Sequence, residues 1–196
     1  MPADPRKDDL RLHARARRRD AHARFGVRIG PVLRANFMQA FSLPGVAVVA
    51  GYHAIGEEAD IDPLLTALHE RGHPVGLPRV VAPGAALQFH AWAPGDALDT
   101  GYQKIPEPPA NAPVIEPDVV LVPLLAYDAT GYRLGYGGGF YDRTLAALRA
   151  ARTVLVIGIA YSDQRVDSLP AGDHDQRLDA VLTELGVERF GLKDEA

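Results

Sequence analysis

The chain contains no cysteine among its 196 residues. Disulfide scaffolds, thiolate zinc sites, iron–sulfur clusters and cysteine nucleophiles are therefore excluded, so any chemistry must come from oxygen and nitrogen groups. No apolar run approaches the length of about 18 residues that a membrane span requires, and the first twenty residues lack the apolar core of a secretory signal. These absences predict a soluble, cytoplasmic protein with no membrane partner.

Composition places the chain among ordinary globular proteins, with 47% hydrophobic and 23% charged residues. The 19 glycines and 16 prolines indicate many loops, yet fewer than a disordered or low-complexity chain would have. We expect one domain spanning residues 1–196, and a monomer.

Charge is distributed unevenly along the chain, whose net charge is -4. Residues 1–34 hold ten Lys and Arg against four Asp and Glu, so the remainder is strongly acidic. A basic segment on an acidic body is either a nucleic-acid arm or a source of cations for an anionic ligand held elsewhere in the fold.

Apolar runs alternate with segments of helical character along most of the chain. Helices are predicted over residues 7–24, 31–41, 61–71 and 141–149, and strands over residues 46–52, 74–81, 87–92, 119–125 and 154–159. This alternation predicts an α/β fold: a single three-layer domain with a mainly parallel sheet flanked by helices, and a basic helix at the N-terminus. Residues 93–117 are rich in Pro and Gly and predict a long surface loop.

The most informative stretch is DVVLVPLLAYDATGYRLGYGGGFYDR, residues 118–143, which predicts a strand, a turn, a glycine-rich loop and a helix. Four loop glycines would let backbone N–H groups converge on phosphate at a helix N-terminus, and Arg133 would add a cation. A flexible surface loop is the alternative, because the run matches neither the Rossmann nor the Walker A pattern. Asp142 is a magnesium ligand if phosphate binds there, and otherwise it complements the helix dipole.

Four blocks of the sequence together resemble the 5-formyltetrahydrofolate cyclo-ligase family. They are Lys7, Leu10 and Arg11 in KDDLR; Tyr52 and Glu58 in YHAIGEEADIDPLL; RLGYGGGFYDR with the upstream PLLAYDATG; and Gln164, His174, Asp175 and Asp179 in the C-terminal IGIAYSDQRVDSLPAGDHDQRLDAVLTE. The glycine block is the most specific of the four, and the blocks span nearly the whole chain.

The resemblance implies an enzyme that uses ATP and Mg²⁺ to cyclise 5-formyltetrahydrofolate to 5,10-methenyltetrahydrofolate, releasing ADP and phosphate. By position, the residues implied to bind ATP are Lys7, Arg11, Arg133, Leu134, Gly135, Tyr136, Gly137, Gly138, Gly139, Phe140 and Tyr141. Those implied to bind the folate are His53, Glu58, Tyr136, Gly137, Gly138, Gly139 and Phe140, with Asp142 and Asp175 at magnesium. Arg133 and Glu58 are the implied catalytic residues.

Several alternatives stay open at the level of sequence. Gln103 stands where the family has an aromatic residue, for which Tyr102 or Trp92 would substitute, and Glu57 adjoins Glu58. The run from Arg15 to Arg19 is predicted to be a solvated helix face. An ATP-dependent enzyme with a different acceptor is one alternative function, and a non-catalytic nucleotide- or RNA-binding protein is another. The acidic body argues against a nucleic-acid partner and favours small-molecule substrates.

Overall fold

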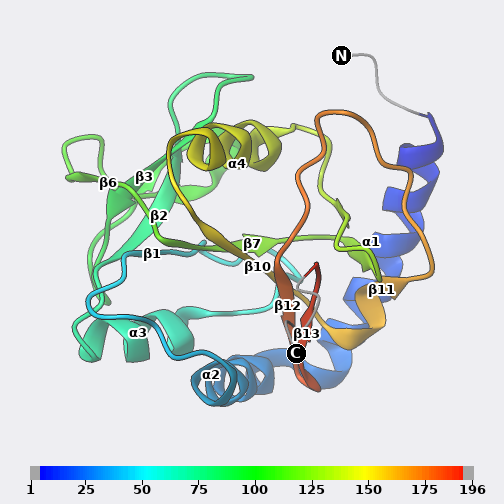
Figure 1. Ribbon diagram of the computed structural model, residues 1–196, viewed down its shortest axis with the longest axis horizontal. Coiled ribbons are helices and arrows are strands. Elements are labelled where there is room, and N and C mark those ends of the chain that lie inside the picture. The colour runs from blue at the N-terminus through cyan, green and yellow to red at the C-terminus, as the bar shows by residue number, and fades with distance from the viewer. Residues whose placement is uncertain (1–4, 192–196) are drawn as a thin grey trace.

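The computed structural model describes residues 5–191, and four α-helices surround a large sheet within this range (Figure 1). They are α1 (Pro5–Phe25), α2 (Ile29–Ala40), α3 (Asp62–Glu70) and α4 (Phe140–Ala151). Three short 3₁₀ turns accompany them: η1 (Gly26–Arg28), η2 (Tyr102–Lys104) and η3 (Ser162–Gln164). All four predicted helices are confirmed, with ends shifted by one to two residues. Among the described residues, no helix combines the length and apolar character needed to cross a membrane.

Eight strands form the main sheet in the order β13-β12-β10-β7-β1-β2-β3-β6. Their bounds are β1 (Val49–Ala50), β2 (Val75–Val80), β3 (Leu87–Ala91), β6 (Val114–Ile115), β7 (Val119–Pro123), β10 (Leu155–Ile159), β12 (Ala180–Thr183) and β13 (Gly186–Arg189). The five central strands, from β12 to β2, pair in parallel. The outer strands β13, β3 and β6 pair antiparallel. The predicted sheet is therefore confirmed as mostly parallel, with antiparallel edges.

Both faces of the sheet are buried, which gives the predicted three layers. Along β7, Val119 and Leu121 pack toward α2 and α3, whereas Val120 and Val122 pack toward α4. Figure 1 shows α2 and α3 below the sheet and α4 above it. A strand covered on both faces needs apolar residues at consecutive positions, as the unbroken run VVLVP provides.

Two predictions about local structure are wrong. The strand predicted over residues 46–52 is reduced to β1, because the N–H of Val48 donates to the Asp118 carboxylate and the chain leaves the sheet after Gly51. The loop predicted over residues 93–117 contains the antiparallel pair β4 (Asp99–Thr100) and β5 (Pro106–Glu107), besides the edge strand β6. The carboxylate of Glu107 is buried there and accepts the N–H of Val80, which ties this segment to the sheet.

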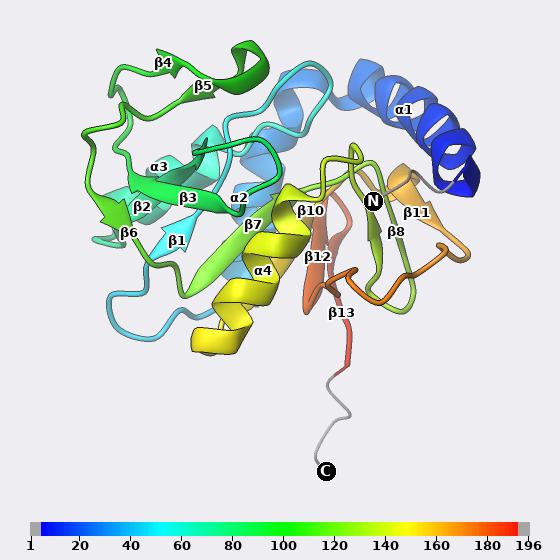
Figure 2. The same cartoon turned by 90° about the horizontal axis from the view of Figure 1, so that it is seen from above.

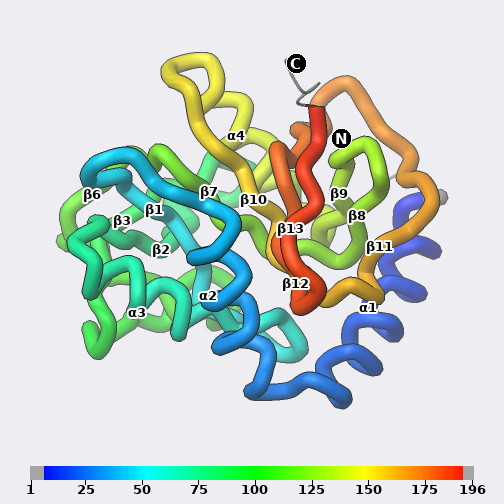
Figure 3. Tube along the Cα trace, turned by 60° about the horizontal axis from the view of Figure 1, so that its bottom comes forward, coloured from blue at the N-terminus to red at the C-terminus, as the bar shows by residue number. Residues whose placement is uncertain are grey.

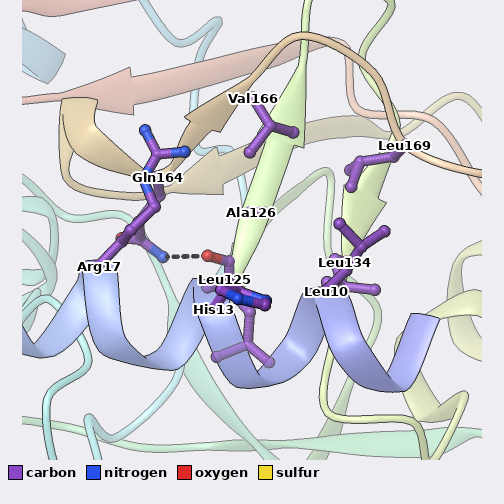
Figure 4. Close-up of a pocket in the computed structure, with 10 residues that line it drawn as sticks. Leu10, His13, Arg17, Leu125, Ala126, Leu134, Gln164, Val166 and Leu169 are labelled. Atoms are coloured by element: carbon purple, nitrogen blue, oxygen red, sulfur yellow. Dashed lines mark hydrogen bonds between the residues drawn. The ribbon is translucent and has the colours of Figure 1, made fainter. Parts of the chain in front are cut away.

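A second, three-stranded sheet that the sequence did not predict lies beside α1 (Figures 2 and 3). It pairs β8 (Ala126–Asp128) with β9 (Arg133–Leu134) and β11 (Arg165–Val166). A cavity of about 120 Å³ lies between α1 and these strands, and its lining is mainly apolar (Figure 4). Gln164, one of the lining residues, donates to the carbonyls of Leu124 and Leu125. Leu134 is the one residue that this lining shares with the predicted ATP-binding residues.

Candidate active site

The glycine loop runs from β9 into the first turn of α4. Gly139 caps the helix in the left-handed conformation, with φ +63°, and supplies no side-chain acceptor for the N–H groups of the first turn. Gly137 has φ +103°, which L-residues with a side chain rarely adopt. The loop glycines therefore carry no side chains that would cover the backbone, and the loop leads directly into the N-terminus of α4. This arrangement favours a bound anion.

Helix α1 reaches this loop although more than 120 residues separate them in sequence. The Nε–H of Arg11 donates to the carbonyl of Gly135 at 3.1 Å, and its guanidinium lies against Gly137, where a Cβ would stand 3.3 Å from Cζ. The prediction that the basic N-terminal helix brings a cation to the glycine loop matches this geometry. Leu134, at the start of the loop, is buried in the core and offers only its backbone.

Arg133 and Asp142 form an ion pair beneath the loop. Nη2 of Arg133 donates to Oδ1 of Asp142 at 2.8 Å, and Nη1 donates to the carbonyl of Gln176. The Arg133 side chain is only 4% exposed, and this burial lowers the pKa of the guanidinium, an effect that Asp142 opposes. Arg133 thus fixes the carboxylate at the start of α4, and both of its terminal nitrogens already donate to protein acceptors.

Lys7 and Asp175 form a second ion pair at the same end of the molecule, with Nζ 2.6 Å from Oδ2. Asp175 also contributes to the electrostatic environment of Arg133, so the two predicted magnesium ligands face one cluster of cations. Within residues 5–191 no three His, Asp or Glu side chains are grouped as a complete metal site. Two carboxylates are nevertheless suitable ligands for Mg²⁺, because this ion completes its coordination with phosphate oxygens and water.

Glu58 lies on the other side of the loop and is almost fully buried. Its Oε1 accepts the O–H of Tyr136 at 2.8 Å, and its Oε2 accepts the N–H of Ile55 at 3.0 Å. Burial raises the pKa of this carboxyl above its ordinary value, and these two hydrogen bonds oppose the shift. The neighbouring Glu57 is half exposed, so the structure selects Glu58 as the acid that faces inward.

Tyrosines surround this carboxyl. Burial raises the pKa of the Tyr136 phenol to about 12, and it raises the pKa of Tyr141 further, with Glu58 adding to both shifts. His53 is partly exposed near Glu58, with Nδ1 3.9 Å from Oδ2 of Asp62. Tyr52 is a core residue whose O–H donates to the carbonyl of Ala59. The structure thus brings His53, Glu58, Tyr136 and Tyr141 to one place.

Arg18 corrects the prediction that residues 15–19 form a solvated face. It is 4% exposed, whereas Arg17 and Arg19 are exposed. Its Nη1 donates to the phenol oxygen of Tyr136 and lies 3.8 Å from Oε1 of Glu58. The sequence spacing could have indicated this position. Arg18 follows Arg11 by seven residues, which is two helical turns, so both side chains lie on the same face of α1.

The two aromatic residues expected to substitute near position 103 lie in different places, Tyr102 beside the start of α4 and Trp92 against the main core. The ring of Tyr102 meets that of Phe140 edge to face, with centroids 5.9 Å apart, so the 3₁₀ turn η2 reaches the start of α4. Gln103 in that turn has φ +52° and is exposed. Trp92 packs against the main core, and its buried indole N–H finds no acceptor in the described part of the chain.

The model of the 5-formyltetrahydrofolate cyclo-ligase family matches residues 3–184 of this sequence. The chain belongs to this family. It is 42% identical over 142 residues to the 5-formyltetrahydrofolate cyclo-ligase of Mycolicibacterium smegmatis, covering 69% of this chain and 72% of that protein. The same-named protein of Escherichia coli strain K12 is 39% identical over 141 residues, which cover 69% of this chain and 76% of the relative.

Two solved structures share the fold of this chain. The 5,10-methenyltetrahydrofolate synthetase of Aquifex aeolicus superposes with a TM-score of 0.71 at 28% identity, covering 97% of this chain and 96% of that one. The synthetase of Mycoplasma pneumoniae gives a TM-score of 0.68 at 23% identity over 91% of this chain and 98% of that one. The second likeness shows the fold alone.

Proposed function

We propose that this protein catalyses the ATP- and Mg²⁺-dependent cyclisation of 5-formyltetrahydrofolate to 5,10-methenyltetrahydrofolate, releasing ADP and phosphate. The observation that carries the proposal is the position of the glycine loop between two charged groups of side chains. Cations and two carboxylates lie at its phosphate end, and the buried acid Glu58 lies at the other.

ATP is assigned to the loop and the start of α4. The N–H groups of the first helical turn and the guanidinium of Arg11 supply hydrogen-bond donors and positive charge to the phosphates. Lys7 adds a second cation from the same helix. Phosphoryl transfer needs positioning and charge neutralisation more than covalent help, so the absence of cysteine removes nothing that this reaction requires.

Magnesium is assigned to Asp142 and Asp175, whose hard carboxylate oxygens suit it. When bound, the ion would neutralise phosphate charge that would otherwise repel the two acids. Both carboxylates are now held by cations, Asp142 by Arg133 and Asp175 by Lys7. These ion pairs keep the acids in place before the metal and nucleotide are present.

The folate is assigned to the Glu58 side of the loop. There the carboxyl is held by Tyr136 and Ile55, with His53 nearby, and it is placed to hydrogen-bond a pterin or balance positive charge on the folate nitrogens. The formyl oxygen attacks the γ-phosphorus of ATP, the bond to the β-phosphate oxygen breaks, and ADP leaves. The N10 nitrogen then attacks the activated carbon and loses its proton, and the carbon–oxygen bond breaks to release phosphate.

The test is to mix the purified protein with ATP, Mg²⁺ and 5-formyltetrahydrofolate and to follow the methenyl absorbance together with ADP. We expect one methenyl product per ADP, and no product when ATP is omitted. Glu58→Gln is expected to reduce folate turnover at least about tenfold, because a charge-assisted contact to the folate is lost. The control Glu70→Gln removes the same charge from an exposed residue at the end of α3 and should keep its activity. ATP binding without a methenyl product would point to a different acceptor, and failure to bind ATP would contradict the proposal altogether.

A further inference from the structure

Arg18 is a buried guanidinium that lies between two small apolar residues on one face of α1. Ala14 and Ala21 lie one turn before and after it, and they are 5% and 0% exposed. Arg18 is itself 4% exposed, and its Nε–H finds no hydrogen-bond partner within residues 5–191. A buried donor without a partner opposes folding, so packing alone would favour another small apolar residue at this position.

The guanidinium of Arg18 lies beside two carboxylates: Nη2 donates to Oε2 of the half-exposed Glu57 at 3.5 Å, whereas Nη1 is directed at the buried Glu58. Nη1 donates to the phenol oxygen of Tyr136, whose own O–H donates to Oε1 of Glu58 at 2.8 Å. Nη1 also lies 3.8 Å from that same oxygen, and Cζ stands 5.3 Å from the centre of the Tyr136 ring. Arg18 thus holds both the phenol and the carboxylate from the side of α1.

Helix α1 contacts two consecutive residues of the glycine loop. Arg11 binds the carbonyl of Gly135, and two turns later Arg18 binds the side chain of Tyr136. One rigid element therefore connects the nucleotide end of the loop with the acid at its folate end.

We propose that Arg18 is a positioning residue for the folate step: through Tyr136 it holds Glu58 in place as a carboxylate, and it does not itself contact the nucleotide. This inference rests on the proposed function. It deepens that function by adding a residue from α1, outside the four sequence blocks, to the folate side of the site.

The charge state of Glu58 follows from the groups that face it. They are Arg18 on α1, Tyr136 in the glycine loop, Tyr141 on α4, and Tyr52 and His53 in the segment after β1. Burial favours the neutral acid and raises its pKa, whereas the bonds from Ile55 and Tyr136 and the charge of Arg18 favour the carboxylate. Removing Arg18 therefore moves the pKa of Glu58 upward.

The experiment compares Arg18→Met and Arg18→Lys with the matched control Arg19→Met, which removes the same charge from an exposed neighbour. We expect Arg18→Met to raise KM for 5-formyltetrahydrofolate about tenfold, as for the loss of one charge-assisted hydrogen bond, with KM for ATP within about twofold of wild type. The acid limb of the pH profile of kcat/KM for the folate should move to higher pH. Arg18→Lys should recover part of both effects, because it keeps the charge.

A purely structural role gives a different result, in which both KM values change together, the acid limb stays in place and lysine does not rescue. That result, or an Arg18→Met profile equal to that of Arg19→Met, would overturn the proposal. Carboxyl NMR titration of ¹³C-glutamate-labelled protein, with Glu58 assigned by Glu58→Gln, gives a readout independent of turnover. If wild type makes no methenyl product, the proposed function fails, and an unchanged Glu58 pKa in Arg18→Met then rejects the Arg18 inference separately. Should Arg18→Met not fold, the same titration is made on Arg18→Gln, which also removes the charge, and an unchanged pKa of Glu58 there rejects the proposal.

Discussion

Replacing Gly137 with alanine tests whether the glycine loop works through its backbone geometry. Gly137 has φ +103°, and a Cβ there would stand 3.3 Å from Cζ of Arg11 and 3.4 Å from its Nη2. The side chain therefore imposes two penalties, a strained backbone and a displaced arginine. The loop of the variant can relax in the free protein, but it must return to the strained conformation when phosphate binds.

The size of the effect follows from the strain. A residue with a side chain held in such a conformation costs about 1 to 3 kcal/mol. Since about 1.4 kcal/mol corresponds to a tenfold change in an equilibrium constant, ATP affinity should fall by about 5-fold to about 150-fold. Folate affinity should change less, because Glu58 is held by Tyr136 and Ile55 and not by Gly137.

The assay is calorimetric titration of ATP with Mg²⁺ into wild type, Gly137→Ala and the control Gly45→Ala. Gly45 has φ +52° and lies in the loop between α2 and β1, where a Cβ would meet no atom of the described residues within 4 Å. The control thus introduces backbone strain outside the site and should leave ATP affinity unchanged. An affinity of Gly137→Ala within about twofold of wild type would show that ATP binding does not depend on the backbone conformation of Gly137, whatever happens to stability.

Three further outcomes are expected at the acids and their partners. Asp142→Asn should raise the Mg²⁺ concentration for half-maximal activity at least about tenfold, and an unchanged magnesium titration would remove Asp142 from the metal site. Because burial raises the pKa of Glu58 in the folded protein, its ionisation opposes folding above that pKa and has no effect below the unfolded value of about 4.3. Glu58→Gln should therefore raise Tm near pH 7, with the gain vanishing toward pH 4, and a gain that is independent of pH would contradict the assignment. Arg133→Met leaves the Gln176 carbonyl without its donor, and it leaves Asp142 with the N–H of Gln176 but no cation. Urea unfolding should therefore show a loss of about 1 to 3 kcal/mol, and a wild-type midpoint would show that the pair does not support the loop.

Sequence patterns predicted the layers well because the central strands are buried on both faces and so carry long apolar runs, as in β7 and β10. They failed where short strands rely on individual polar contacts. The β4–β5 pair depends on Glu107, whose buried carboxylate accepts backbone N–H groups from Val80 and Tyr102. No periodicity reveals such a contact, and a segment rich in Pro and Gly therefore resembled a loop.

The candidate site was predicted best where glycine and helix geometry determine it. The pairing of Lys7 with Asp175 and of Arg133 with Asp142 could not be predicted, because both depend on how distant segments meet. The burial of Arg18 could not be predicted for another reason. A run of arginines is usually solvated, and only its register with Arg11, Ala14 and Ala21 separates the buried arginine from its exposed neighbours.

The central claim is that the formyl oxygen attacks ATP and leaves as part of phosphate. Labelling the formyl group of 5-formyltetrahydrofolate with ¹⁸O and analysing the released phosphate by mass spectrometry tests this claim directly. We expect one ¹⁸O atom in the phosphate for each methenyl product formed. Methenyl product accompanied by unlabelled phosphate would contradict it.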